Sequence, residues 1–230
     1  MTTSGTFQFS PSLGELVLYA FNIAQIRNTA LTQEHMESAR MATNLMLARW
    51  SNQGVNLWAV DQVTVPLVQG QATYTVDPST VMILDMYMTT TSGTSYTNRI
   101  ALPISRTEYA SYPNPTSQGF PTVFWFDRLL SPTVTLWPTP DGTSATSMSY
   151  YRVRRIMDSS YSNGQNVEVP YLWLEAFADG LAYRLSKIWM PTMAPALKAV
   201  ADESYSIAAS QNVEQAQQYI SPQIVGYYRP

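Results

Sequence analysis

The chain has 230 residues, of which 45% are hydrophobic and only 13% charged, with a formal net charge of −3 at pH 7. This balance excludes an intrinsically disordered chain, which would be rich in charge and poor in aromatic residues, and also a basic field strong enough to grip DNA. The absence of cysteine excludes disulfides and thiolate metal sites. A surface with few charges and many tyrosines is typical of large permanent interfaces, or of a neutral extracellular β-protein.

Residues 12–54 predict two helices. Ser12 and Glu15 have the spacing of a capping box, in which each side chain bonds the backbone N–H of the other. Thr32 is a good N-cap for the second helix, and Glu34 places negative charge in its first turn. Gly54 predicts the end of that helix in a left-handed conformation. The apolar stripes are Leu16, Tyr19, Ala20, Ile23 and Ile26, then Ala39, Ala42, Met46 and Trp50.

From residue 57 to residue 158 the apolar period changes to two, which is typical of antiparallel strands and hairpins. Residues 69–71 predict a tight turn, and Asp141-Gly142 predicts a hairpin. Pro66 and Pro138 indicate edge strands or strand ends. Residues 105–115 predict a short helical turn followed by a proline-rich loop.

Helical periodicity returns at Val169–Met190 and at about Ala196–Ala209. After Gln211 the sequence has no clean period and ends in large apolar side chains, which predicts an extended tail that docks either on a partner or on its own domain. The first residues lack the pattern of a signal peptide. No run of 18 or more apolar residues is present, so we expect no membrane span.

These elements predict an α+β fold, mainly an α-helical bundle of about four helices with an inserted antiparallel β-subdomain and an extended C-terminal tail. The expected divisions are an N-terminal helix pair over residues 1–56, a β-rich insertion over 57–158, a helix pair over 159–210 that completes the bundle, and a docking tail over 211–230.

Little in the sequence predicts catalysis. His35 is the only histidine and lies at an expected polar position of a helix, so we expect no metal and no cofactor. Phosphate-binding, dinucleotide-binding and hydrolase motifs are missing. The remaining enzymatic hypothesis is a cell-wall glycosidase that uses Glu175 and Asp179, which share a helix face. A carbohydrate-binding version of this alternative would use the aromatic platforms Trp125, Trp137 and Tyr150.

Four cations are candidates for contact with phosphates or with a partner's acids. Arg152 and Arg154 lie on one face of an expected strand, and Arg184 and Lys187 are three residues apart on an expected helix. The alternative interpretation is ordinary ion pairing within or between subunits.

The N-terminal helix pair resembles the opening of the head-to-tail adaptor proteins (connector or tail accessory proteins) of podovirus-type phages. The positions that carry the resemblance are Glu15-Leu16-Val17 with Ala20, Leu31-Thr32 with Glu34, and then Leu45-Met46-Leu47, Trp50, Gly54 and Leu57-Trp58. The segment Val169–Trp189 is similar to the long helix that follows in those proteins. The large β segment departs from compact members, which have only a short connection there.

The resemblance implies a structural, non-enzymatic virion protein, assembled in the host cytoplasm into a ring of about twelve copies, a dodecamer, beneath the portal. Such a ring joins the portal to the tail nozzle and carries fibres or spikes. It also prolongs the channel for DNA ejection, in which genomic DNA passes without sequence-specific contact. The resemblance further implies that the C-terminal segment docks on the portal. Its docking side chains would be Tyr219, Ile220, Ile224, Val225, Tyr227 and Tyr228.

Overall fold

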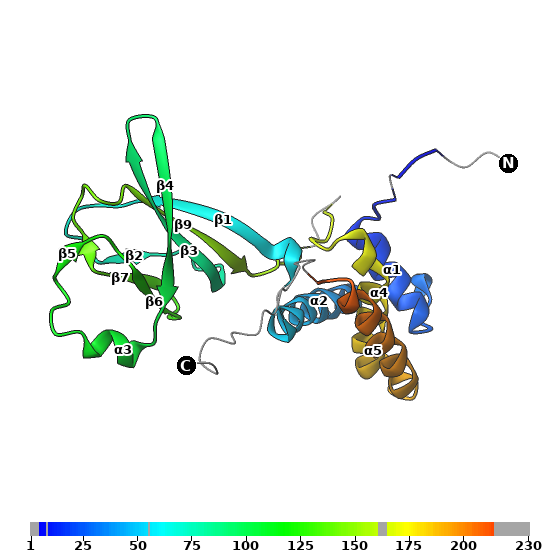
Figure 1. Cartoon of the computed structure of the whole chain (residues 1–230). Helices are drawn as coiled ribbons and strands as arrows, with labels where there is room; N and C mark the ends of the chain where they lie inside the picture. Colours follow the sequence, from blue (N-terminus) through cyan, green and yellow to red (C-terminus); the bar gives the residue numbers. More distant parts are fainter. Residues whose placement is uncertain (1–4, 8, 55, 161–164, 214–230) are drawn as a thin grey trace, which may run out of the picture.

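The computed structural model describes residues 5–7, 9–54, 56–160 and 165–213. They form two lobes joined by a narrow neck, one lobe built on a sheet and the other on helices (Figure 1). Two chain segments pass through the neck, one entering the sheet lobe before strand β1 and one leaving it after strand β9.

The helical lobe is made by α1 (Leu13–Ile23), α2 (Gln33–Gln53), α4 (Leu174–Trp189) and α5 (Ala194–Ser210). The short 3₁₀ turns η1 (Asn28–Ala30), η2 (Leu57–Ala59) and η3 (Tyr171–Trp173) connect them to each other and to the neck. Helix α4 is central, because α1, α2 and α5 all pack against it.

Local signals set the helix ends, with two corrections. The capping box of Ser12 and Glu15 is confirmed at the start of α1. Thr32 caps α2 as expected, but its reciprocal partner is His35, whose Nδ1 lies 2.7 Å from the Thr32 hydroxyl. His35 lies in the first turn of α2, as expected, but it is partly buried because its ring also stacks on Trp189 at 4.0 Å. Gly54 does end α2, but with φ 160° it is extended rather than left-handed.

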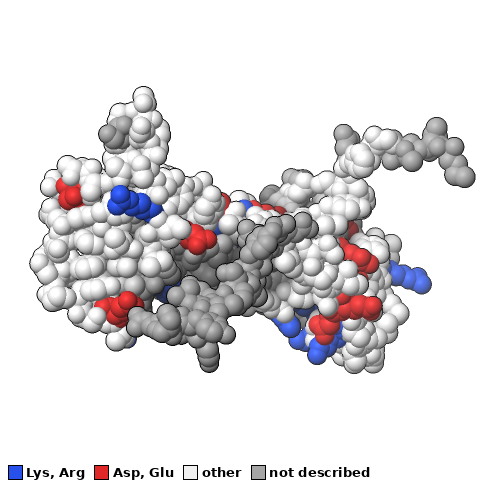
Figure 2. Space-filling model, in the orientation of Figure 1, with Lys and Arg blue, Asp and Glu red and all other residues white. Residues whose placement is uncertain are grey.

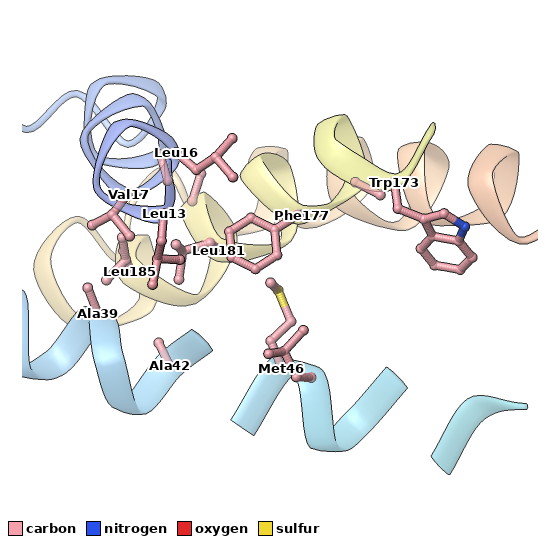
Figure 3. Close-up of a cluster of buried hydrophobic side chains, with 14 of the residues drawn as sticks. Leu13, Leu16, Val17, Ala39, Ala42, Met46, Trp173, Phe177, Leu181 and Leu185 are labelled. Atoms are coloured by element: carbon pink, nitrogen blue, oxygen red, sulfur yellow. The ribbon is translucent and has the colours of Figure 1, made fainter. Parts of the chain in front are cut away.

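The core of the helical lobe lies between α4 and its neighbours (Figure 3). Phe177, Leu181 and Leu185 of α4 are fully buried against Leu13 and Val17 of α1. On the other side of α4, a Cβ at Gly180 would lie 2.8 Å from Met46 Sδ of α2. The glycine thus allows α2 and α4 to approach closely.

The other lobe is a curled seven-stranded sheet in the order β1-β9-β3-β4-β6-β7-β2. Its strands are β1 (Val60–Pro66), β2 (Thr73–Thr75), β3 (Thr80–Ser92), β4 (Ser95–Pro103), β6 (Val123–Asp127), β7 (Thr133–Trp137) and β9 (Ser147–Arg154). Helix α3 (Arg106–Ser111) connects β4 to the later strands, and β5 (Gln118–Gly119) pairs with β8 (Thr139–Pro140) in a separate small sheet.

The expectation of a mainly helical bundle with a purely antiparallel insertion is wrong. The sheet is a main body of the protein with a core of its own, in which Met86, Met88, Phe124, Leu136 and Met148 are buried. It is also mixed, because β4 and β6 pair in parallel. Register shifts in the pairing of β3 with β9 mark bulges, which increase strand twist and contribute to the curl.

The turn expectations have different outcomes. The turn at residues 69–71 is confirmed by the bond from the Gln71 N–H to the Val68 carbonyl, at 3.2 Å. Asp141-Gly142 does form a turn, but it joins β8 to β9, which belong to different sheets, so the hairpin prediction is wrong. Pro66 is the last residue of β1, an edge strand, as expected.

Strands β3 and β4 project from the sheet as an arm (Figure 1). Strand β4 pairs with β6 only at Leu102 and Pro103. Among the described residues, β3 is therefore the only partner of β4 over residues 95–101. One face of β4 carries three exposed apolar residues. They are Tyr96, Ile100 and Leu102, which are 73%, 74% and 61% exposed.

No helix in the described part of the chain combines the length and the apolar character needed to cross a membrane.

Replacing Phe177 by alanine should lower the free energy of unfolding of the helical lobe by about 3–5 kcal/mol, because it leaves a cavity at the centre of that core. Urea unfolding, monitored by the far-ultraviolet circular dichroism signal of the helices, measures the loss of stability. The matched control is Leu172→Ala, since Leu172 is 65% exposed, and it should change stability by less than about 0.5 kcal/mol. Equal losses in the two variants would contradict this packing.

Candidate interaction surfaces

Ion pairs fasten the neck between the lobes. Arg152 of β9 makes a bidentate pair with Asp61 of β1, with Nε to Oδ1 at 2.6 Å and Nη2 to Oδ2 at 3.2 Å. Its Nη1 also donates to the Thr80 hydroxyl at 3.0 Å. The hydrogen bond to Asp61 raises the pKa of Arg152. The pairing therefore ties the two strands next to the neck to β3.

Arg154 extends these contacts into the chain that returns to the helices. Its guanidinium makes a bidentate pair with Glu168, and its Nε lies 3.7 Å from Asp61. The carboxylate of Glu168 also accepts from the Met157 N–H at 2.7 Å. Arg154, more than any other group, lowers the pKa of Glu168. We call Asp61, Arg152, Arg154 and Glu168 the neck clamp.

A second connection joins α2 to the returning chain. The Asn44 side-chain amide donates to the Ser159 carbonyl at 3.1 Å and accepts from the Ser159 N–H at 2.8 Å. The cleft between α2 and the sheet lobe has a volume of about 480 Å³. Arg128 and Arg155 line it, together with Asn44 and Asp158.

The four candidate cations therefore differ in their surroundings. Arg152 and Arg154, 11% and 18% exposed, have intrachain carboxylate partners, which agrees with the ion-pairing interpretation. Arg184 is half-buried, and this burial and then the charge of Arg49 lower its pKa. Lys187 is exposed, with its Nζ 5.7 Å from the centre of the Tyr183 ring. A role of these residues toward DNA stays a prediction.

Arg49 and Arg184 lie together in a small depression between α2, α4 and α5. Asp202 lines the same depression, but among the described residues neither arginine has a carboxylate within ion-pair distance. Arg184 is half-buried beside the exposed Arg49, and a partly buried cation next to a like charge is costly unless an anion joins it. This depression is therefore a candidate contact for a carboxylate of another chain.

A larger apolar groove lies on the opposite side of the lobe, between α1 and the start of α4. Its volume is about 460 Å³. We call it the α1–α4 groove, lined by Phe9, Pro11, Glu15, Leu16, Tyr19, Leu174, Glu175 and Ala178.

The glycosidase hypothesis finds little support in this geometry. Glu175 lines the α1–α4 groove, whereas Asp179 is partly buried, and this burial raises its pKa. Tyr150 is only 2% exposed, so the prediction that it is a sugar platform is wrong. Trp137 is covered by Tyr112, with which it stacks at 4.1 Å. No group of three or more potential metal-binding side chains occurs in the part of the chain that the structure describes.

The predicted portal-docking side chains, Tyr219 to Tyr228, lie outside the described residues. The last described turn is close to the neck, because the Asn212 side chain accepts a hydrogen bond from the Leu57 N–H at 3.1 Å. The described chain therefore ends near the neck.

One family match covers the neck, the sheet lobe and the helical lobe apart from most of α1. Residues 21–226 match the SU10 adaptor protein family. The chain belongs to the SU10 adaptor protein family. No curated protein matches the chain.

The SU10 adaptors are structural proteins of phages, so the resemblance to phage head-to-tail adaptors is confirmed. The chain is accordingly a viral protein and a virion component. Trp50, which carried part of the resemblance, packs on Trp173 at 5.3 Å and Tyr205 at 5.9 Å. It thereby joins α2 to η3 and α5.

Neither the α1–α4 groove nor the pair of Arg49 and Arg184 could be recognised in the sequence. The low charge content of the chain did indicate interfaces, and Figure 2 shows a mostly uncharged face on the sheet lobe.

The neck clamp predicts a specific acid sensitivity. Because Arg154 holds the folded-state pKa of Glu168 below its ordinary value of 4.5, the contribution of Glu168 is complete above about pH 4.5. That contribution is lost as pH falls through the lower folded pKa. Glu168→Gln should reduce the free energy of unfolding at pH 7 by about 1.5–3 kcal/mol, as for a hydrogen-bonded charge.

Chemical unfolding at pH 7 and at pH 3 measures this difference. The variant should lose less stability than the native protein between the two values. Glu203→Gln, at an exposed position of α5, is the matched control and should behave like the native protein. A native-like pH dependence in Glu168→Gln would contradict the assigned role of the pair.

Proposed function

We propose that this SU10 adaptor is a non-enzymatic ring protein that joins the portal of a short-tailed phage to its tail nozzle. The family match carries the proposal, because it spans residues 21–226 and so includes the sheet lobe and helices α2, α4 and α5 of the helical lobe. A ring of identical copies needs two different complementary surfaces on each copy. The α1–α4 groove and the mostly uncharged face of the sheet lobe are surfaces of the kind that such contacts use.

In this proposal the ring continues the DNA channel below the portal and gives fibres or spikes a platform. DNA passes without a sequence-specific grip, in keeping with a net charge of −3. Arg152 and Arg154 already have carboxylate partners within the chain, so Arg184 and Lys187 are the better candidates for contacts between subunits.

The C-terminal segment is the proposed portal anchor. The described chain ends near the neck, where Asn212 bonds Leu57, and the 17 residues that follow Val213 would span about 55 Å if fully extended. Its apolar side chains, from Tyr219 to Tyr228, would be buried on the portal. Each buried side chain of this size contributes about 1.5–3 kcal/mol.

Deleting residues 214–230 should weaken binding to purified portal by at least about 100-fold, which corresponds to the loss of only two such anchors. The deletion starts beyond Asn212 so that its bond to Leu57 remains. A pull-down titration measures affinity, and electron microscopy of the mixture with portal shows whether rings form.

A matched pair of full-length variants separates anchoring from chain length. Ile220→Ser with Ile224→Ser should reproduce most of the loss, whereas Gln217→Ser with Gln218→Ser should bind normally. Undiminished binding by the truncated protein would refute the docking role of the tail.

A further inference from the structure

Helix α2 presents an exposed ridge that runs from its outer side to the depression between α2, α4 and α5. Met41 and Leu45 are 59% and 55% exposed, and Arg49 follows with the same spacing of four residues. Residues four apart lie on one helix face, so these three side chains form a continuous row. We call Met41, Leu45 and Arg49 the α2 ridge.

The apolar part of the ridge is followed by the positive charge of Arg49. Arg49 lies beside Arg184, and neither has a carboxylate partner among the described residues. A surface that buries Met41 and Leu45 would therefore complete the contact best if it also brought a carboxylate to Arg49.

The α1–α4 groove has the opposite properties. Its apolar lining includes Leu16, Tyr19 and Leu174, and the carboxylates of Glu15 and Glu175 border it. An apolar groove with acidic borders is the form of site that receives a helix with apolar anchors and a cationic end.

We infer that the α2 ridge of one copy inserts into the α1–α4 groove of a second copy. Met41 and Leu45 fill the apolar groove, and Arg49 meets Glu15 and Glu175. This contact rests on the proposed ring and specifies the surfaces by which its copies meet. The charge complementarity and the match of apolar ridge to apolar groove select a second copy as the occupant.

The ridge and the groove of one copy cannot meet each other. Helices α1 and α2 lie on opposite sides of α4 (Figure 3). A contact between two different surfaces leaves one ridge and one groove free at the ends of every open chain of copies. It therefore propagates from copy to copy until a ring closes.

Cysteine cross-linking tests the contact directly, since the native chain contains no cysteine. Leu45→Cys places a thiol on the ridge, and Tyr19→Cys places one on the wall of the groove. Rings of the full-length double variant, formed on purified portal and verified by electron microscopy, are oxidised and separated under denaturing conditions. The expected result is a ladder of covalent oligomers.

Two controls define the ladder. An equal mixture of the single variants should give covalent dimers only, because each copy then has one thiol. Leu45→Cys combined with Ile100→Cys, on the projecting arm, should give no ladder although Ile100 is 74% exposed.

The outcomes distinguish this contact from the proposed function. Rings without a ladder, or rings in which the Leu45→Cys variant alone cross-links to itself, would overturn the contact and leave the ring intact. Failure to form rings with native protein under any condition would overturn both. A ladder from rings supports the contact.

A charge exchange gives an independent measurement. Arg49→Glu should weaken ring assembly by about tenfold or more, and combining it with Glu175→Arg should restore much of the loss, because the pair is re-formed with reversed signs. Lys198→Glu, at an exposed position of α5, is the control and should assemble normally. No recovery in the double variant, with native circular dichroism, would count against the pairing of Arg49 with Glu175.

Discussion

The arrangement of this protein depends on the ion pairs of the neck clamp. Asp61 lies close to two arginines, and Arg154 also binds Glu168, so one network connects β1, β9 and the chain that returns to the helices. Each lobe has its own core, and apolar packing within a lobe does not determine where the other lobe lies. Directional contacts between charged groups can do so, because a bidentate pair restricts both distance and angle. In a ring, such a restriction would set the angle at which every sheet lobe leaves the bundle.

Much of the local structure could be predicted from the sequence, because its causes are local. The capping box needs only Ser12 and Glu15, three residues apart, and the strands follow from alternation along each segment. The order of the sheet could not be predicted. Its parallel pair brings Leu102 beside Val123, and nothing in either segment specifies that partner. The prediction of a mainly α-helical bundle was wrong for the same reason, because a curled sheet with its own core arises from pairing between strands that are distant in the sequence.

The candidate surfaces were even less accessible to sequence reasoning. Arg152 was noticed as a cation, but its partner Asp61 is 91 residues away. The α1–α4 groove combines Phe9 with Leu174, which are distant in the chain and meet only because α1 packs on α4. Met41 and Leu45 do show a helical spacing, yet spacing alone does not tell which face of a helix remains uncovered. That depends on the positions of the other helices.

The projecting arm has a consequence for the time before the virion is complete. Proteins commonly protect an open strand edge with charged side chains, proline or a covering segment. Along residues 95–101, Arg99 is the only charged residue, and its guanidinium lies over the ring of Phe120. Among the described residues nothing else covers this edge, so association of free copies by strand addition would rise with the concentration of unassembled protein. Incorporation of folded copies into a particle would keep that concentration low.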